Sequence, residues 1–407
     1  MSSFPLFSVM GIEIEYMLVD SETLDVRPES DTLLQALAGK LCNEVELGEI
    51  AVSNELVMHV LELKNNGPKP PDAPIAQHFQ QALDSLQPLL VKHHLQLLPT
   101  GAHPWMNPAQ ETRRWPHGNR DIYHQFDKIF NCQGHGWSNL QSMHINLPFA
   151  NDDEFNQLHN AIRLILPLLP AISASTPFLD GQFTGMLDSR LDFYEKNQQN
   201  IPSICAGVIP EFVSSEGEYR DRILAPMYRD ISAFDPEGIL QHEWLNSRGV
   251  IPKFEYNALE IRIMDTQECV DADIALAKAV FAILQYWQQR SPYYLDKPCD
   301  RLRLKALYDQ TRIKGLDVAV ADSELLRQWQ INKPMSTCRQ VWSHLIEQVS
   351  PSLDANSQRT LEYILSQGNL AERMLRACGN DHSKTNLTRI YRQLGHCLMS
   401  NQVFNPS

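Results

Sequence analysis

The segment GIEIEY, residues 11–16, alternates apolar and acidic side chains. Because successive side chains of a β-strand point to opposite faces of a sheet, this alternation predicts a strand with Ile12 and Ile14 on a buried face. Glu13 and Glu15 then share the other face, about 6.7 Å apart if the strand is regular. The segment therefore predicts a sheet that is apolar on one side and acidic on the other.

Three further segments alternate in the same way: LELK (61–64), MHINL (143–147) and LEIRI (259–263). They add Glu62, His144 and Glu260 to the polar face, and Arg262 follows Glu260 by two residues. A sheet with one covered and one open face is typically antiparallel. We therefore expect an α+β fold, with a mostly antiparallel sheet and helices on its apolar side.

Helical periodicity marks the segments between these strands and the whole C-terminal part of the chain. The expected helices cover residues 75–95, 152–174, 271–288, 300–313, 321–331, 335–349, 355–377 and 383–398. No alternating segment follows the fourth strand. We therefore predict a sheet-containing domain over residues 1–295 and a helical C-terminal extension over residues 296–407, packed on it.

The composition excludes several classes of partner. The 407 residues include 35 Lys and Arg against 49 Asp and Glu, a net charge of −14. A non-specific nucleic-acid binder needs the opposite balance, and an anionic membrane surface attracts basic segments instead. The most apolar stretch, residues 164–174, is too short to span a bilayer. Because the N-terminus lacks a basic n-region and the eight cysteines form no CxxC pair, we expect reduced thiols and a cytoplasmic protein.

The acidic face requires compensation of its charge. Carboxylates at the spacing of Glu13 and Glu15 repel one another by roughly 2–3 kcal/mol at an effective dielectric constant of about 20. Oxygen ligands with a single imidazole suit Mg²⁺ or Mn²⁺ better than a structural zinc ion. The alternative is the solvated face of an ordinary amphipathic sheet, which explains one glutamate better than it explains four such segments. Neither GxxxxGK[ST] nor GxSxG occurs, which excludes a P-loop and that serine nucleophile.

Seven segments carry a resemblance to a known family: GIEIEY (11–16), ELVMHVLELK (55–64), GAHPW (101–105), HGNRDIY (117–123), MHINLP (143–148), ASTPFLDGQFTGMLDSR (174–190) and LEIRIMDTQ (259–267). In their order they resemble glutamate–cysteine ligase family 2, which includes the YbdK-like carboxylate–amine ligases and belongs to the glutamine synthetase-like superfamily. The resemblance covers about residues 10–290. It implies a catalytic sheet of glutamine synthetase type, curved into a funnel that ATP enters at one end and the amino-acid substrate at the other.

The resemblance also implies which residues hold metal ions. These are Glu13, Glu15, Glu55, Glu62, His144 and Glu260. Glu55 lies seven residues before Glu62, which would place it on the opposite face of a regular strand. Its inclusion therefore requires a bend or a bulge between the two residues.

Four arginines and one tyrosine complete the implied site. Arg262 matches the arginine beside the nucleotide phosphates, and Arg190 matches the arginine that faces the substrate carboxylate. Arg248 would be a second nucleotide contact, although its distance of four residues from the preceding tryptophan departs from the YbdK-like spacing of three. Arg120 and Tyr123 lie in a segment that lines the substrate side, and they are equally explained as a surface ion pair and a core aromatic residue.

The expected reaction is the ATP-dependent joining of a carboxylate to an amine through an acyl phosphate, with Mg²⁺ or Mn²⁺ as cofactor. The family name implies glutamate and cysteine as the substrates and a γ-glutamyl bond in the product. Two alternatives remain open: a phosphotransferase resembling the guanidino kinases, and a non-catalytic metal- or ligand-binding relative. We expect small-molecule amino-acid partners, and the sequence leaves a homodimer open.

Overall fold

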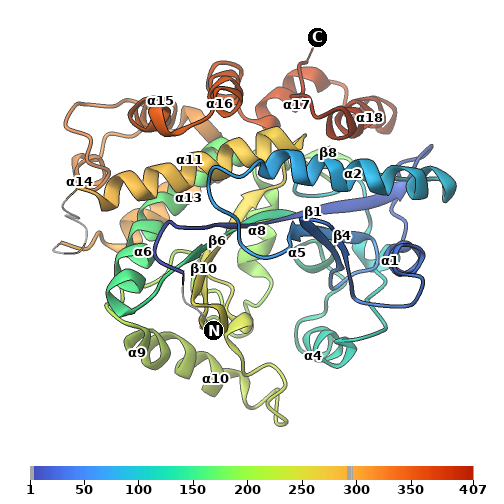
Figure 1. The fold of residues 1–407 in the computed structure, drawn as a ribbon, viewed down its shortest axis with the longest axis horizontal. Helices are drawn as coiled ribbons and strands as arrows, with labels where there is room; N and C mark the ends of the chain where they lie inside the picture. Colours follow the sequence, from blue (N-terminus) through green and yellow to red (C-terminus); the bar gives the residue numbers. More distant parts are fainter. Residues whose placement is uncertain (1–3, 291–294, 296, 407) are drawn as a thin grey trace.

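The computed structural model describes residues 4–290, 295 and 297–406. Its centre is an eight-stranded sheet in which every described strand pair is antiparallel, in the order β2-β3-β4-β1-β6-β10-β9, with β5 pairing with the far end of β1 (Figure 1). The strands are β1 Gly11–Asp20, β2 Glu44–Leu47, β3 Ile50–Asn54, β4 Val60–Asn65, β5 Leu95–Leu98, β6 Ser142–Pro148, β9 Val250–Lys253 and β10 Ala258–Asp265. The four strands predicted from alternation are β4, β1, β6 and β10, which are consecutive neighbours. The predicted α+β class is confirmed.

The apolar face of the sheet is buried under helices. Ile14 of β1, Leu63 of β4, Ile145 of β6 and Ile261 of β10, one from each alternating segment, are fully buried in one core. In Figure 1, α2 (Ile75–Lys92) and α11 (Val270–Gln288) lie above the sheet. They pack against each other, and α11 also packs against α6 (Asp152–Ile165). The polar face is left on the opposite side, as the alternation predicts.

The predicted helices occur with two differences. The segment 152–174 is divided into α6, a 3₁₀ turn Leu166–Leu168 and α7 Leu169–Ser173, because prolines at 167 and 170 cannot supply the helical N–H donors. The expected single helix 355–377 is wrong, since it consists of α16 and α17. Gly368, with φ of 93°, ends α16, and Asn369 caps α17 in a capping box with Glu372.

The C-terminal part of the chain consists of helices. They are α13 Arg301–Lys314, α14 Ser323–Gln328, α15 Cys338–Val349, α16 Ala355–Gln367, α17 Leu370–Cys378 and α18 Lys384–Ser400. In Figure 1, α15 to α18 lie beyond α11 and α2, and α15 and α16 pack on α11. Leu394 of α18 joins Val19 of β1 in a second core. The C-terminal helices therefore pack against the sheet domain, while the division into two domains at 295 and 296 stays a prediction, and that boundary adjoins residues outside the described ones.

The remaining elements are a two-stranded sheet and further helices and turns. They are α1 Ser30–Ala38, α3 Pro108–Glu111, α4 Arg120–Phe130, α5 His135–Ser138, β7 Phe178–Leu179, β8 Gln182–Phe183, α8 Ser189–Lys196, α9 Glu216–Tyr219, a π-helical turn Arg220–Leu224, α10 Ala225–Ile231, and 3₁₀ turns Glu243–Leu245, Phe254–Tyr256, Gly315–Asp317 and Ser350–Ser352. Among the described residues, no helix is both long and apolar enough to cross a membrane. All eight cysteines are free thiols.

Candidate functional site

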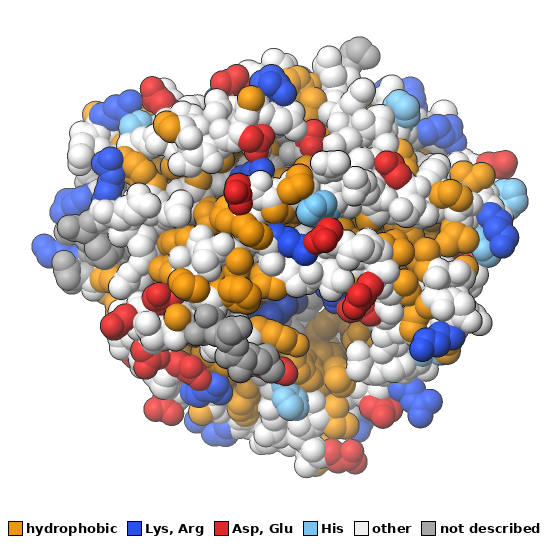
Figure 2. Space-filling view, viewed as in Figure 1, with side chains coloured by type: hydrophobic (Ala, Val, Ile, Leu, Met, Phe, Trp, Pro, Cys, Tyr) orange, Lys and Arg blue, Asp and Glu red, His pale blue; other side chains and the backbone are white. Residues whose placement is uncertain are grey.

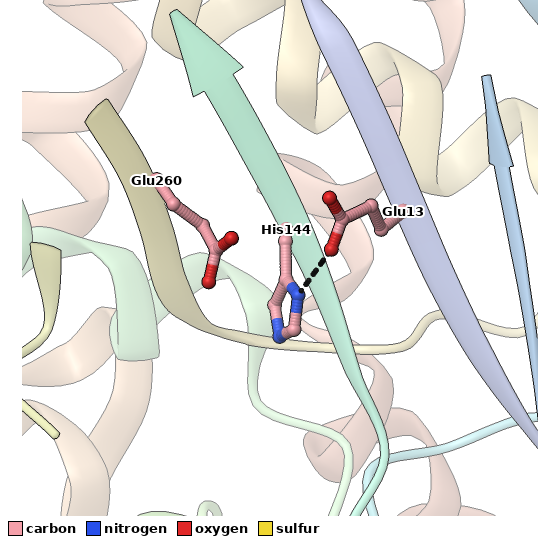
Figure 3. Close-up of side chains that lie close together, drawn as sticks. All are labelled: Glu13, His144 and Glu260. Atoms are coloured by element: carbon pink, nitrogen blue, oxygen red, sulfur yellow. Dashed lines mark hydrogen bonds and ion pairs between the residues drawn. The ribbon is translucent and has the colours of Figure 1, made fainter. Parts of the chain in front are cut away.

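Strand register brings the acidic residues of four strands together. Glu13 of β1 lies opposite His144 of β6, and Glu15 lies opposite Glu62 of β4. Glu260 of β10 lies opposite the residue two positions beyond His144. Figure 3 shows the side chains of Glu13, His144 and Glu260 converging from three neighbouring strands. The predicted acidic face is therefore one continuous cluster.

Two sets of three side chains in this cluster are arranged as a metal site would require. The ligand atoms of Glu13, His144 and Glu260 lie within 4.8 Å of one another, and so do those of Glu15, Glu62 and His144. The sets share His144. Four of the five side chains belong to buried residues, and Glu13 is partly exposed. The donors are carboxylate oxygens and one imidazole, which fits Mg²⁺ or Mn²⁺.

Hydrogen bonds fix the orientation of the shared histidine. Its Nδ1 lies 3.1 Å from Glu13 Oε2, and its Nε2 lies 2.8 Å from the hydroxyl of Ser142. The backbone N–H of Ser142 donates to Glu15 Oε2 at 2.7 Å. Burial alone would lower the pKa of His144, but the hydrogen bond to Glu13 and the surrounding carboxylates raise it. The imidazole is therefore held between the two sets by Glu13 of β1 and Ser142 of β6.

Glu13 is ionised although it lies among other carboxylates. Burial alone would raise its pKa, but the charge of Lys253 and the hydrogen bond from His144 hold that pKa well below its usual range. The side-chain amide of Asn146 also donates to Glu13 Oε1 at 2.9 Å. A carboxylate whose charged form is stabilised in this way is suited to a cation.

Glu55 joins the cluster through a turn between two strands. It directly follows β3, where Ser53 lies opposite Glu62 and donates to its Oε1 at 3.0 Å. Glu55, two residues beyond Ser53, continues the same face, so the required bend is the β3–β4 turn. Burial and the charge of Glu62 raise the pKa of Glu55 well above its usual value. The position expected for Glu55 is thereby explained.

Two lysines in the cluster were not identified from the sequence as site residues. Lys64 Nζ lies 3.1 Å from Glu62 Oε1, and Lys253 Nζ lies 3.3 Å from Glu13 Oε1. Lys253 also forms an ion pair with Glu260. Lys64 was detectable, since it continues the alternation of its strand, whereas Lys253 ends a four-residue strand that contains a proline and shows no alternation.

The contact between Lys253 and Glu13 shows that the sheet is curved. Two strands, β10 and β6, separate β9 from β1. Because side chains stand away from a flat sheet, a contact across two intervening strands indicates that the sheet curves toward its polar face. The lower part of the face shown in Figure 2 is hollowed, in the region between α10 and α4 of Figure 1.

Arg262 lies at the edge of the cluster. Its Nε is 2.8 Å from Glu260 Oε1, and its Nη1 donates to the carbonyl of Asn246 at 3.4 Å. A β-bulge follows directly, because Ile261 pairs with Ile145 but Met264 pairs with Met143. Arg262 thus lies beside Glu260, and its role toward nucleotide phosphates stays a prediction.

The bulge determines where Arg190 lies. The extra residue returns Asp265 to the polar face, opposite Ser142. Asp265 accepts the backbone N–H of Ser175 at 2.8 Å and forms an ion pair with Arg190 Nε. Arg190 is 2% exposed, and its Nη2 has no hydrogen-bond partner within the described part of the chain. Its role toward a substrate carboxylate stays a prediction.

Arg248 is not brought to the carboxylate cluster by any described contact. Its guanidinium forms two hydrogen bonds with Glu211, at 2.7 and 3.0 Å, and its Nη1 donates to the side chain of Asn246 at 3.1 Å. Asn246 thus lies between Arg248 and Arg262. The guanidinium is already engaged by protein groups, so a direct nucleotide contact would require these bonds to change.

The two candidates on α4 differ in position. Arg120, at the start of the helix, has a side chain that is 71% exposed and lies 3.7 Å from Asp121. The hydroxyl of Tyr123 accepts from the side-chain amide of Asn54 at 3.4 Å. Burial and the charge of Glu55 raise the pKa of that hydroxyl. Tyr123 is therefore adjacent to the Glu55 end of the cluster, whereas Arg120 forms a surface ion pair.

An antiparallel sheet with an acidic inner face and outer layers of helices defines a glutamate–cysteine ligase-like fold. The solved glutamate–cysteine ligase of Francisella tularensis, in complex with AMP, aligns with a TM-score of 0.63 over 98% of this chain and 90% of its own, at 12% identity. A bifunctional glutathione synthetase from Pasteurella multocida aligns with a TM-score of 0.57 over 97% of this chain and 53% of its own, at 12% identity. At such identities the similarity shows the fold alone.

The chain belongs to glutamate–cysteine ligase family 2, whose model matches residues 9–393. An uncharacterized protein of Archaeoglobus fulgidus is 31% identical over 97% of this chain and the whole of its own. A protein of Bdellovibrio bacteriovorus named "Putative glutamate--cysteine ligase 2" is 25% identical over 70% of this chain and 68% of its own. The resemblance inferred from seven segments is confirmed. The family match extends beyond residues 10–290 and includes most of the C-terminal helices.

Proposed function

We propose that this protein is an ATP-dependent carboxylate–amine ligase, of the glutamate–cysteine ligase kind. The observation that carries the proposal is the pair of three-residue sets that share His144, bordered by Arg262 and Lys253. Clustered carboxylates beside cationic side chains suit the binding of metal ions and polyphosphate rather than acid–base catalysis of hydrolysis. Membership of the family supports the same reaction class.

The residues present fit a divalent cation. Glu13, His144 and Glu260 would hold one ion, and Glu15 and Glu62 would hold a second, with Glu55 close by. When bound, such ions neutralise the negative charge of the polyphosphate. The nucleotide itself is suggested by the AMP complex of the Francisella tularensis enzyme.

The protein's own contribution is binding, orientation and electrostatic stabilisation. A carboxylate oxygen of the acid attacks the γ-phosphorus, the bond to the ADP oxygen breaks, and an acyl phosphate forms. The amine then attacks the acyl carbon, phosphate leaves with that oxygen, and the amine proton passes to solvent. Arg262 stabilises the charge on the transferring phosphoryl group. No side chain becomes covalently bonded, which agrees with the absence of a nucleophile motif in the sequence.

Hydroxylamine trapping tests the reaction. With ATP, Mg²⁺ and glutamate, hydroxylamine should replace the amine and yield a hydroxamate in equal amount to the ADP formed. Other carboxylic acids are tested in the same way, in case the substrate is not glutamate. ADP formation with an acid but without any hydroxamate would contradict the ligase proposal and favour a phosphotransferase of the guanidino-kinase kind, whose phosphoryl group goes to nitrogen.

A further inference from the structure

Lys253 lies on the same face of the sheet as the acidic cluster. It ends the edge strand β9, where Ile251 pairs with Glu260 of β10. Lys253 is two residues beyond Ile251, so its side chain leaves the strand on the face that carries Glu260. The lysine is thus built into the edge of the site by strand register.

The ammonium of Lys253 contacts two of the three side chains in one candidate metal set. It lies 3.3 Å from Glu13 Oε1 and forms an ion pair with Glu260 Oε2. The third member, His144, contacts the other oxygen of Glu13. The Lys253 side chain is 31% exposed, against 16% for Glu13 and 2% for Glu260. The lysine is therefore the most accessible part of this group.

A divalent cation and this ammonium compete for the same oxygens. Mg²⁺ binds carboxylate oxygens at about 2.0–2.1 Å, whereas an ammonium hydrogen bond needs about 2.7–2.9 Å. Two cations that share the carboxylates of Glu13 and Glu260 would also repel each other at close range. Metal binding therefore requires Lys253 to release at least one of them.

We propose that Lys253 is an internal counter-cation that a divalent metal ion displaces from Glu13 and Glu260, and that the displaced ammonium then binds the phosphate oxygens of the nucleotide. The second step rests on the proposed function. Once metal is bound, the carboxylates of Glu13 and Glu260 are occupied by the metal ion and by Arg262, which stays beside Glu260. Lys253 then has no carboxylate of this set left to pair with. When metal and nucleotide are bound in the site, the polyphosphate is the anion that lies within reach of the released Lys253.

This exchange has a consequence for the order of binding. In the metal-free protein the lysine offsets the repulsion between Glu13 and Glu260, so the site is formed before metal binds. Metal binding frees a positive group at the edge of the site, where it favours the nucleotide. Metal and nucleotide should therefore bind with positive cooperativity that depends on Lys253.

The experiment measures Mn²⁺ binding to the full-length protein without nucleotide, by electron paramagnetic resonance of free Mn²⁺. Lys253→Met should bind Mn²⁺ about tenfold more tightly than the original protein, because the competitor is gone. Lys253→Arg keeps the charge and should retain the original affinity within about threefold. The matched control is Lys69→Met, since Lys69 pairs with Glu49 outside the cluster and should not affect Mn²⁺.

A second measurement follows binding of a non-hydrolysable ATP analogue at saturating Mn²⁺. Lys253→Met should weaken it about tenfold, and Lys69→Met should not change it. Unchanged or weaker Mn²⁺ binding in Lys253→Met would overturn the displacement, and unchanged analogue binding would overturn the transfer to phosphate. Lys253→Gln provides the same comparisons if the methionine variant fails to fold. The Mn²⁺ arm uses no substrate, so it stands even if hydroxylamine trapping fails.

Discussion

Glu13 has the most direct contacts with positive or donor groups in the acidic cluster, since His144, Asn146 and Lys253 all reach its carboxylate. Glu13→Gln removes the charge and keeps the shape. We expect kcat to fall by about 100-fold or more and Mn²⁺ binding to weaken, because a ligand oxygen of the first set becomes a neutral amide. Steady-state kinetics with a Mg²⁺ titration measures this. Glu49→Gln, in the ion pair with Lys69, is the control. Near-normal turnover of a folded Glu13→Gln protein would refute the metal-site assignment.

His103 predicts how stability depends on pH. Its Nε2 donates to the carbonyl of Leu24 at 2.7 Å, and its Nδ1 accepts the backbone N–H of Trp105 at 3.3 Å. Protonation at Nδ1 would break the second bond, and burial lowers the pKa of His103 to about 4. An unfolded histidine has a pKa of about 6.5. The unfolded state therefore binds more protons between these values, and stability falls as the pH falls, by up to about 1.4 kcal/mol per pH unit.

Urea unfolding at pH about 7 and about 5 measures the effect. His103→Asn should lose less stability on acidification than the original protein, although it is less stable at neutral pH. The exposed His396→Asn is the control and should follow the original protein. An unchanged acid response in His103→Asn would show that this imidazole does not cause it.

At the residue scale, the sequence predicts those site residues that lie in segments of alternating apolar and polar side chains. Glu13, Glu15, Glu62, His144 and Glu260 each lie at the polar position of an alternating segment, and all five meet in the structure. Lys253 was missed because its neighbours on β9 do not alternate. The ion pair between Arg190 and Asp265 was missed because a bulge, which alternation cannot reveal, places Asp265 on the polar face.

At the element scale, the end of β10 is joined to the segment that leads into α8 through Asp265. Its carboxylate accepts from Ser175 and Thr176 and pairs with Arg190, which is almost fully buried. Asp265→Asn removes the charged partner of this buried guanidinium, which typically costs about 3–5 kcal/mol of unfolding free energy. Urea unfolding gives the loss.

Arg190→Lys separates that structural role from substrate binding. The ammonium keeps the charge but loses the planar fork. We expect the KM for the acidic substrate to rise while the KM for ATP stays the same, since Nη2 has no hydrogen-bond partner among the described residues and could donate to a carboxylate. A Lys variant with lower stability and unchanged KM for the acid would assign Arg190 to structure alone.

The strands β3, β5 and β9 could not be predicted from the sequence, because they are either buried on both faces or very short. β3 is buried at all five positions, so IAVSN shows no alternation. β5 and β9 have four residues each, too few for a period to be recognised. The central strands β4, β1, β6 and β10 were predictable because each has one apolar and one polar face. Of the two edge strands, β2 (EVEL) alternates but has only four residues, and β9 shows no alternation.

At the scale of the whole molecule, the C-terminal helices are joined to the sheet domain by a buried ion pair. Arg373 of α17 pairs with Glu268, which follows β10, and both side chains are fully buried. The backbone of Phe404 contacts both, because its N–H donates to Glu268 at 3.1 Å and its carbonyl accepts from Arg373 at 2.7 Å. With the shared second core, these contacts predict that the sheet and the C-terminal helices unfold together.

Replacement of Arg373 by Met tests this coupling. Arg373→Met leaves Glu268 buried without its partner, so we expect a loss of about 3–5 kcal/mol in a single transition, followed by circular dichroism for the helices and by tryptophan fluorescence. The double variant Glu268→Gln with Arg373→Met removes the unpaired charge as well and should recover part of that loss. Met in place of the exposed Arg359 is the control. Two separate transitions would instead show that the C-terminal helices form an independent unit, because only a weakly coupled extension can unfold while the acidic site remains folded.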